Sequence, residues 1–277
     1  MHVILTGGTG TIGLPVLHRC LSTPDITRLS VLSRRPFELP TGPTTNVSDP
    51  AYDTSKAEII VHTDYTSYPA ELLDRLRGAQ AVIWAQGVSQ SEVPKDVYTQ
   101  ITYDAPLAAA KAFSSLPSSP PFTFVYVSAA GADPTEKTWA LFGKVKGRAE
   151  RELLTLADTL KADAPAASSP LLRAFNVRPT GVMPGRLYPE AERERPWSYR
   201  YIIPLLMPPM RFLAPSMLSP TDEIATVLVD LALGKFPDEF KVNEDGGRLK
   251  GEGIEGGRTI VASAMRRWAA LRGVVGA

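Results

Sequence analysis

Short apolar runs alternate with stretches of helical spacing over the first two thirds of the chain. A β-like run at His2–Leu5 is followed by a helical pattern at Ile12–Leu21. Further β-like runs, each bounded by polar, Pro or Gly residues, lie at 29–32, 58–61, 81–85, 122–127 and 171–177. Helices are predicted between them at 70–77, 105–114 and 139–157. The alternation predicts βαβ crossovers and a parallel sheet with helices on both faces, which is the doubly wound Rossmann class of α/β fold.

The last hundred residues have a different pattern. A Pro- and Gly-bearing loop at 178–186 precedes a charged stretch, 190–195, and a segment rich in Pro, Met and aromatic residues, 196–220. Helical spacing returns at 221–233, and 259–271 predicts a final basic, amphipathic helix. We therefore predict one domain over residues 1–277, in which residues 178–277 supply most of the substrate-side elements.

Three polar or apolar insertions interrupt this order. Segments 38–56 and 162–170 are rich in Pro, Thr or Ser and predict surface loops. The apolar stretch Tyr201–Leu218 carries Met207, Met210 and Met217, whose flexible thioethers suit the roof of a hydrophobic substrate pocket. A packing surface or a homodimer surface would have the same composition.

The composition is that of an ordinary globular protein, with 44% hydrophobic and 21% charged residues. Thirty Lys and Arg against 29 Asp and Glu leave a net charge of +1, which favours neither nucleic acid nor an anionic membrane as a partner. A small-molecule substrate fits better. The apolar stretch 201–218 carries four prolines and Arg211, so it does not read as a membrane-spanning helix.

The cysteine and histidine content bounds the chemistry further. Cys20 is the only cysteine, which excludes an internal disulfide and a cysteine-cluster metal site. The three histidines (His2, His18 and His62) are too scattered among the predicted elements to form a metal site. Since the first strand begins at once, no signal peptide is visible, and we expect a cytoplasmic protein with no metal.

The segment Thr6–Gly13 reads TGGTGTIG and lies between the first strand and the first helix. Gly7 permits a tight turn, Gly10 lets the backbone approach a pyrophosphate, and Gly13 lets helix and strand pack closely. The amides of Thr11, Ile12 and Gly13 then face the phosphate at a helix N-terminus, which favours an anion without needing a lysine. The segment predicts a dinucleotide site, with Thr6 at its start.

The residues after the second strand bear on the choice between NAD and NADP. An NAD site commonly presents an Asp or Glu there to the ribose hydroxyls. This chain has Ser33, Arg34 and Arg35, and two guanidinium groups suit the 2′-phosphate of NADP. The alternative is a solvated basic turn. Asp64, just past the third strand, could accept a hydrogen bond from the adenine amino group.

Beyond the glycine turn, four other motifs resemble those of a known family. They are AVIWAQG at 81–87, VSAAGA at 127–132, VKG at 145–147 and the Arg178-Pro179 loop. With the turn, they make the first 185 residues or so similar to the atypical or extended short-chain dehydrogenase/reductases, especially the Tat-interacting-protein-like and epimerase-like branch. The resemblance implies a Rossmann fold, NAD(P) as cofactor and cofactor contacts at Ala85 and Arg178.

The same resemblance implies an active site of Ser, Tyr and Lys, in which Ser polarises the substrate oxygen, Tyr transfers a proton, and Lys binds the nicotinamide ribose. Ser128 and Lys146 match, but Phe142 stands at the tyrosine position four residues before Lys146. A shift of register to Lys144 restores no tyrosine, because Ala140 lies four residues earlier.

Two interpretations of Phe142 stay open. Another donor, such as Tyr98, Tyr103, the substrate or water, could supply the proton, which would make the chain an oxidoreductase or a cofactor-assisted isomerase acting on a small, apolar carbonyl or alcohol. Otherwise the chain binds NADP without turning it over and serves as a regulator or a protein-interaction module.

Overall fold

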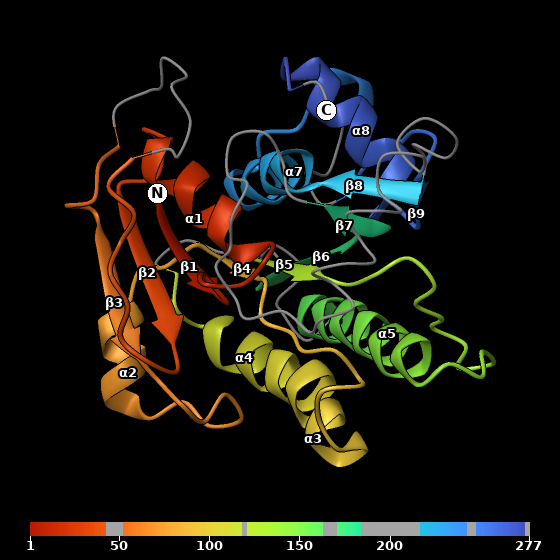
Figure 1. Cartoon of the computed structure of the whole chain (residues 1–277), viewed down its shortest axis with the longest axis horizontal. Helices are drawn as coiled ribbons and strands as arrows, with labels where there is room; N and C mark the ends of the chain where they lie inside the picture. Colours follow the sequence, from red (N-terminus) through yellow and green to blue (C-terminus); the bar gives the residue numbers. More distant parts are fainter. Residues whose placement is uncertain (43–51, 118–120, 163–170, 184–216, 243–247, 275–277) are drawn as a thin grey trace, which may run out of the picture.

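The computed structural model describes residues 1–42, 52–117, 121–162, 171–183, 217–242 and 248–274. Its centre is an eight-stranded sheet in the order β3-β2-β1-β4-β5-β6-β10-β9 (Figure 1). The strands are β1 (His2–Thr6), β2 (Arg28–Ser33), β3 (Ala57–Val61), β4 (Ala81–Trp84), β5 (Phe122–Val127), β6 (Leu172–Arg178), β9 (Ile254–Glu255) and β10 (Thr259–Val261). A separate pair is formed by β7 (Gly181–Met183) and β8 (Leu218–Pro220).

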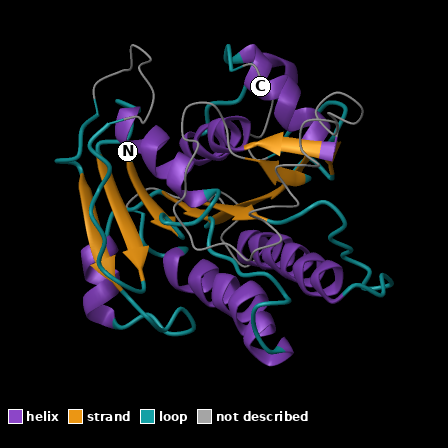
Figure 2. Ribbon diagram, in the orientation of Figure 1, coloured by secondary structure: helices purple, strands orange, loops and turns teal. Residues whose placement is uncertain are grey.

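Helices cover both faces of the sheet, as Figure 2 shows. On one face lie α1 (Gly13–Ser22), α7 (Thr221–Leu233) and α8 (Ala262–Leu271). On the other lie α2 (Ala70–Leu76), α3 (Lys95–Thr99), the π-helical turn η1 (Gln100–Asp104), α4 (Ala105–Phe113) and α5 (Leu141–Ala162). A short 3₁₀ turn, η3 (Asp238–Phe240), follows α7. The predicted Rossmann class is therefore confirmed.

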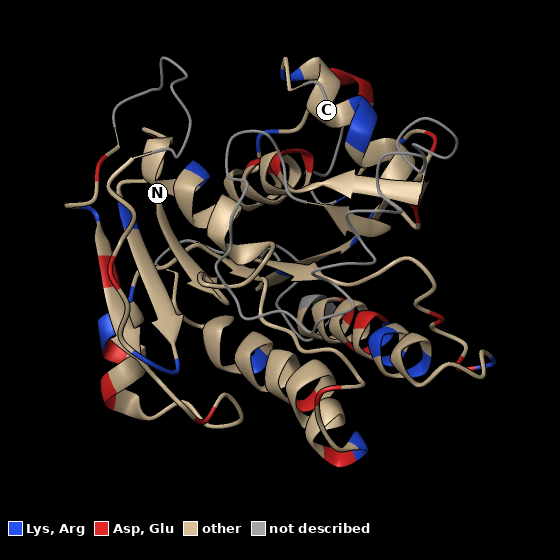
Figure 3. Cartoon of the chain, in the orientation of Figure 1, with Lys and Arg blue, Asp and Glu red and all other residues tan. Residues whose placement is uncertain are grey.

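Strand side chains alternate between two hydrophobic cores. In β1, Val3 and Leu5 join the core under α1 and α7, whereas Ile4 joins the core under α2, α4 and α5. All three are fully buried, as a parallel sheet covered on both faces requires. Acidic and basic residues are intermingled on the outer faces of the helices, for example along α5 (Figure 3).

One predicted helix began too early. Residues 259–261 do not start the final helix but form β10, which pairs in parallel with Asn176–Arg178 of β6. Their β-branched side chains (Thr259, Ile260 and Val261) suit a strand, and only the neighbouring strand, about 80 residues away in sequence, fixes that choice. The helix itself begins at Ala262.

The other predicted strands and helices agree with the structure within about five residues. The helical segment at 95–104 and the short strands β7, β8 and β9 were not predicted, and β7 lies within the segment 178–186 that was predicted as a loop. Parts of the predicted loops 38–56 and 162–170, the charged stretch 190–195 and the apolar segment up to residue 216 lie outside the described residues. No helix in the described ranges has the length and apolarity needed to span a bilayer.

Candidate functional site

The candidate site lies at the carboxyl edge of the parallel strands. Strand β1 pairs in parallel with β2 on one side and with β4 on the other. The order in which strands are added to the sheet therefore reverses between β1 and β4. Ligands of open α/β sheets bind at such a switch point. Here the edge brings together the ends of four strands, at Thr6, Ser33, Ala85 and Ser128.

The glycine turn tolerates no side chain at two of its positions. Gly7 has a φ of +74°, and a Cβ on it would lie 2.6 Å from the carbonyl oxygen of Ala85. A Cβ on Gly13 would lie 1.9 Å from the carbonyl oxygen of Gly7. The amide of Gly10 donates to that same oxygen at 2.8 Å, which closes the turn. Only glycine allows this close approach of strand, turn and helix.

The N-terminus of α1 is available to an anion. No side chain in the described structure caps it, and its first turn carries no acidic residue. The hydroxyl of Thr6, at the end of β1, is buried and has no hydrogen-bond partner among the described residues. Uncapped amides and an unused hydroxyl beside a glycine-only turn fit a diphosphate group.

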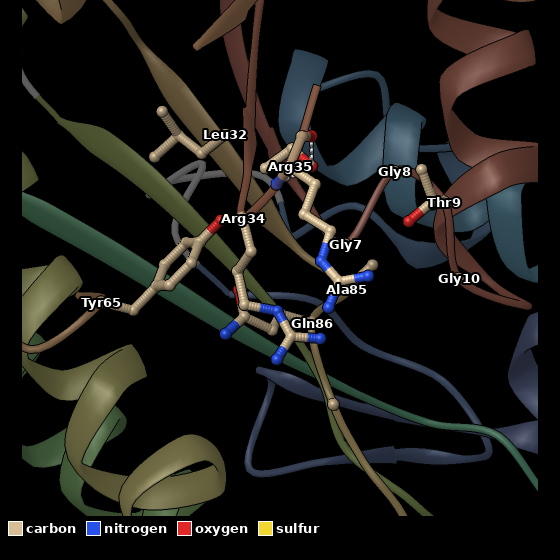
Figure 4. Close-up of a pocket in the computed structure, with 12 residues that line it drawn as sticks. Gly7, Gly8, Thr9, Gly10, Leu32, Arg34, Arg35, Tyr65, Ala85 and Gln86 are labelled. Atoms are coloured by element: carbon tan, nitrogen blue, oxygen red, sulfur yellow. Dashed lines mark hydrogen bonds between the residues drawn. The ribbon is translucent and has the colours of Figure 1, made fainter. Parts of the chain in front are cut away.

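A cavity of about 430 Å³ opens beside this turn (Figure 4). The guanidinium groups of Arg34 and Arg35 extend into it, towards Gln86 and the Gly7 turn. The hydroxyl of Ser33 donates to the carbonyl of Arg35 at 2.7 Å, so Ser33 holds the turn that carries both arginines. No carboxylate is among the described residues that line the cavity, which are Gly7, Gly8, Thr9, Gly10, Leu32, Ser33, Arg34, Arg35, Tyr65, Ala85, Gln86 and Gly87.

A second cavity, of about 190 Å³, shares Arg34, Tyr65 and Gln86 with the first and also contains Asp64. One carboxylate oxygen of Asp64, Oδ1, accepts hydrogen bonds from the amide and the hydroxyl of Thr66, at 2.9 and 2.6 Å. These bonds lower the pKa of Asp64 and keep it an acceptor. The position fits the predicted contact with an adenine amino group.

Ser128 directly follows β5, and both Phe142 and Lys146 of α5 contact the segment from Val127 to Gly131. The Ser128 hydroxyl is buried and unpartnered within the described structure. The Lys146 ammonium donates to the carbonyl of Val127, the residue before Ser128, at 3.2 Å, and burial lowers its pKa to about 8. The Phe142 ring packs beside Gly131, its Cζ 3.4 Å from the position a Cβ would take there. Lys146 therefore contacts the residue before Ser128, and Phe142 packs against Gly131, three residues after it.

Arg178 is engaged elsewhere. Its guanidinium binds the buried carboxylate of Glu150, with Nε 2.8 and 3.1 Å from the two oxygens, and its Nη1 donates to Glu255 at 2.7 Å. The side chain therefore joins α5, β6 and β9. A contact of Arg178 with a cofactor would therefore have to be made by its backbone groups.

Tyr98 and Tyr103, the two alternative proton donors, have partners other than Ser128 in the described structure. Tyr98 is buried, and its hydroxyl is hydrogen-bonded to the side chain of Thr102. Arg148 lies over the ring of Tyr103, 4.4 Å from its centroid. Because Arg148 is two residues from Lys146, the two side chains lie on opposite sides of α5. The ring of Tyr103, which contacts Arg148, therefore lies on the side away from Lys146.

Several cavity residues were not predicted. Gly8, Thr9, Leu32, Tyr65, Gln86 and Gly87 line the first cavity in addition to the predicted set. Gln86 and Gly87 belong to the AVIWAQG segment, whose position after a strand could have indicated them. Tyr65 follows Asp64 and carries no such signal.

No family model matches the chain. Leucinostatins biosynthesis cluster protein T from Purpureocillium lilacinum is 28% identical over 288 residues, spanning 98% of this chain and 96% of its own. Protein FMP52, mitochondrial, from Coccidioides immitis (strain RS) is 28% identical over 154 residues, which cover 55% of this chain and 59% of that protein.

Solved structures give the same picture of the fold. A short chain dehydrogenase family protein from Francisella tularensis superposes with a TM-score of 0.59 at 11% identity, covering 94% of this chain and 96% of that one. MoeE5 in complex with UDP-glucose and NAD gives a TM-score of 0.55 at 16% identity, covering 100% of this chain and 83% of its own. The chain therefore has the Rossmann fold shared by short-chain dehydrogenases and epimerase-like proteins.

Proposed function

We propose that this chain is an atypical short-chain dehydrogenase/reductase that binds NADP(H), and that it acts as an oxidoreductase or a cofactor-assisted isomerase on a small, apolar carbonyl or alcohol. The carrying observation is the cavity between the glycine turn and the Arg34–Arg35 pair. A diphosphate fits the bare amides, and a 2′-phosphate fits two guanidinium groups in a cavity whose described lining holds no carboxylate.

The residues divide the work as follows. Thr6, Gly7, Gly10 and the start of α1, from Thr11 to Gly13, would hold the diphosphate; Arg34 and Arg35 would hold the 2′-phosphate. Asp64 would accept from the adenine amino group and Lys146 would donate to the nicotinamide ribose. When bound, the cofactor would supply hydride chemistry. Ser128, whose hydroxyl has no partner in the described structure, would donate to the substrate oxygen.

Calorimetry tests the cofactor. We expect NADP⁺ to bind at least about tenfold more tightly than NAD⁺, because a charge-assisted contact to a phosphate contributes about 1.5–3 kcal/mol. Arg34→Ala should remove most of the preference while leaving NAD⁺ affinity nearly unchanged. Arg77→Ala, on the exposed end of α2 and paired with Asp74, is the matched control. Equal affinity of the native chain for both dinucleotides would end the argument for NADP.

A second candidate function is a non-catalytic NADP-binding regulator. Phe142 favours it, since the phenol that normally transfers the proton in similar enzymes is missing at that position. NADPH consumption across a panel of small aldehydes and ketones separates the two. Turnover that disappears in Ser128→Ala supports the enzyme, whereas binding without turnover supports the regulator.

We also propose that the protein acts in the cytoplasm on a soluble small molecule. A single buried cysteine, with no disulfide, is compatible with a reducing compartment. Imaging of a fluorescent fusion in its native cells tests the location, and mitochondrial fluorescence would contradict it.

A further inference from the structure

Lys146 places an ionisable nitrogen on the carbonyl of Val127, the residue before Ser128, and Phe142 leaves the proposed reaction without the usual phenol. We propose that the Lys146 ammonium itself delivers the proton to the substrate oxygen and takes it back in the reverse direction. The inference rests on the proposed function, which supplies the carbonyl substrate and the reduced nicotinamide dinucleotide.

The position of the amine is fixed by β5. Its Nζ donates to the Val127 carbonyl at 3.2 Å and lies 5.5 Å from the centroid of the Tyr126 ring. Val127 directly precedes Ser128, and Phe142 lies one helical turn before Lys146 on the same face of α5. The ammonium is therefore held at the carbonyl of the residue that precedes Ser128, which would hold the substrate oxygen.

The carboxylate of Glu150, which could pair with the Lys146 ammonium, is bound by Arg178 instead. Glu150, one turn further along α5, is 1% exposed and is held by Arg178 through both carboxylate oxygens. Arg178 is in turn bound by Glu255 of β9 at 2.7 Å. In the described structure, Lys146 thus has a carbonyl and an aromatic face as partners, and no carboxylate of its own.

Among the described residues, a phenol, Tyr126, faces Lys146, and a second phenol, Tyr98, interacts with Tyr126. Tyr126, on β5, is buried and donates its hydroxyl to the Thr102 carbonyl at 2.9 Å, and burial raises its pKa well above the usual value. Tyr98, from α3, has a raised pKa for the same reason. The raised pKa makes both phenols weak acids, and the hydroxyl of Tyr126 is already donated to the Thr102 carbonyl, so both are poorer proton donors than Lys146 near neutral pH.

The charge state suits proton transfer. Burial lowers the pKa of Lys146 to about 8, and the charge of Glu150 opposes this fall. A donor whose pKa lies near the working pH can both give up a proton and recover it. Phe142 adds apolar surface near the amine and no competing hydrogen-bonding group.

The step balances as follows. During reduction, the carbonyl carbon receives a hydride, with its two electrons, from the reduced nicotinamide dinucleotide. One N–H bond of Lys146 breaks, and its proton forms an O–H bond on the former carbonyl oxygen. The neutral amine would then take up a proton from the solvent, so that each reduction consumes one hydride and one solvent proton.

Titration of the apo-protein tests the amine without requiring turnover. In protein labelled with [¹³C]lysine, we expect one Cε resonance to titrate at about pH 8, to vanish in Lys146→Arg and to persist in Lys144→Arg. Added NADP⁺ should shift that resonance. Titration at the ordinary lysine value of about 10.4 would overturn the proposal.

Kinetics test the proton transfer. With NADPH and the carbonyl panel, kcat should fall as pH rises through about 8, because the protonated amine is the active form. Lys146→Arg keeps the charge but does not release a proton, so we expect kcat to fall about 10²–10⁴-fold while NADPH affinity changes only a few-fold. A loss of affinity with kcat retained would mean that Lys146 only binds the ribose.

The outcomes separate this inference from the function on which it rests. If NADPH does not bind, the proposed function fails. If NADPH binds and is consumed but the decline at high pH survives in Lys146→Arg, only this inference fails. Binding with no turnover on any carbonyl also overturns it and supports the regulator.

Discussion

The carbonyl oxygen of Gly7 lies so close to Gly13 that a Cβ on Gly13 would come within 1.9 Å of it. This contact joins the end of β1 to the first turn of α1. It makes the turn a rigid unit whose shape is set by the absence of side chains. The diphosphate site proposed above depends on that shape.

Gly13→Ala should therefore abolish dinucleotide binding and destabilise the fold. Neither backbone atom can move without displacing the strand or the helix, and we expect the free energy of unfolding to fall by about 2 kcal/mol or more. Calorimetry with NADP⁺ and urea unfolding measure the two effects. Gly42→Ala is the control, because a Cβ there would meet nothing within 4 Å. An undiminished affinity in Gly13→Ala would contradict the role of the turn.

Phe142→Tyr should increase reductase turnover. The new hydroxyl would extend from a ring whose Cζ lies beside Gly131, and would restore the phenol that the family resemblance places at this position. We expect a gain of up to about a hundredfold in kcat on the carbonyl panel, with the decline at high pH moved upwards. Phe142→Leu controls for the change in packing. A loss of turnover in Phe142→Tyr would show that the ring serves a different chemistry.

Arg178→Met should destabilise the protein severely. It would leave the Glu150 carboxylate, which is 1% exposed, without its partner, and breaking a buried pair in this way costs about 3–5 kcal/mol. Urea unfolding measures the loss. Arg75→Met breaks the exposed pair with Glu58 and should cost less than about 1 kcal/mol. Similar losses for both variants would show that the Glu150 pair is not specially buried in solution.

Because two histidines are buried, the free energy of unfolding should fall at acidic pH. Burial lowers the pKa of His2 and of His18 to about 4, below the value of 6.5 expected in the unfolded chain. Unfolding therefore takes up protons below pH 6.5. The stabilisation is complete above pH 6.5 and is lost as pH falls towards 4, by up to about 3 kcal/mol for each histidine.

Urea unfolding at pH 7 and pH 5 measures this loss. His2→Gln and His18→Gln should each reduce the difference between the two pH values, since a glutamine does not titrate. Native protein that is equally stable at pH 7 and pH 5 would contradict the prediction.

The sequence alone determined the features that depend on local pattern. Alternation of apolar runs with helical spacing predicted six parallel strands, because burial on both faces leaves few other arrangements. The TGGTGTIG segment predicted the dinucleotide turn, because glycine spacing after a strand is a property of consecutive residues. The candidate roles of Ser128, Phe142 and Lys146 came from the resemblance to the short-chain dehydrogenase/reductases, and the spacing of four residues places Phe142 and Lys146 on one helical face.

Tertiary structure alone decided which side chains are available at the site. The side chain of Arg178 is bound by Glu150 and Glu255, which are 28 and 77 residues away, so the predicted cofactor contact of this loop is left to its backbone. Residues 259–261 became a strand because β6 offered an edge to pair with. Tyr98 and Tyr103 are engaged by Thr102 and Arg148. Most of these outcomes depend on contacts between segments distant in sequence, whose energies no local pattern contains.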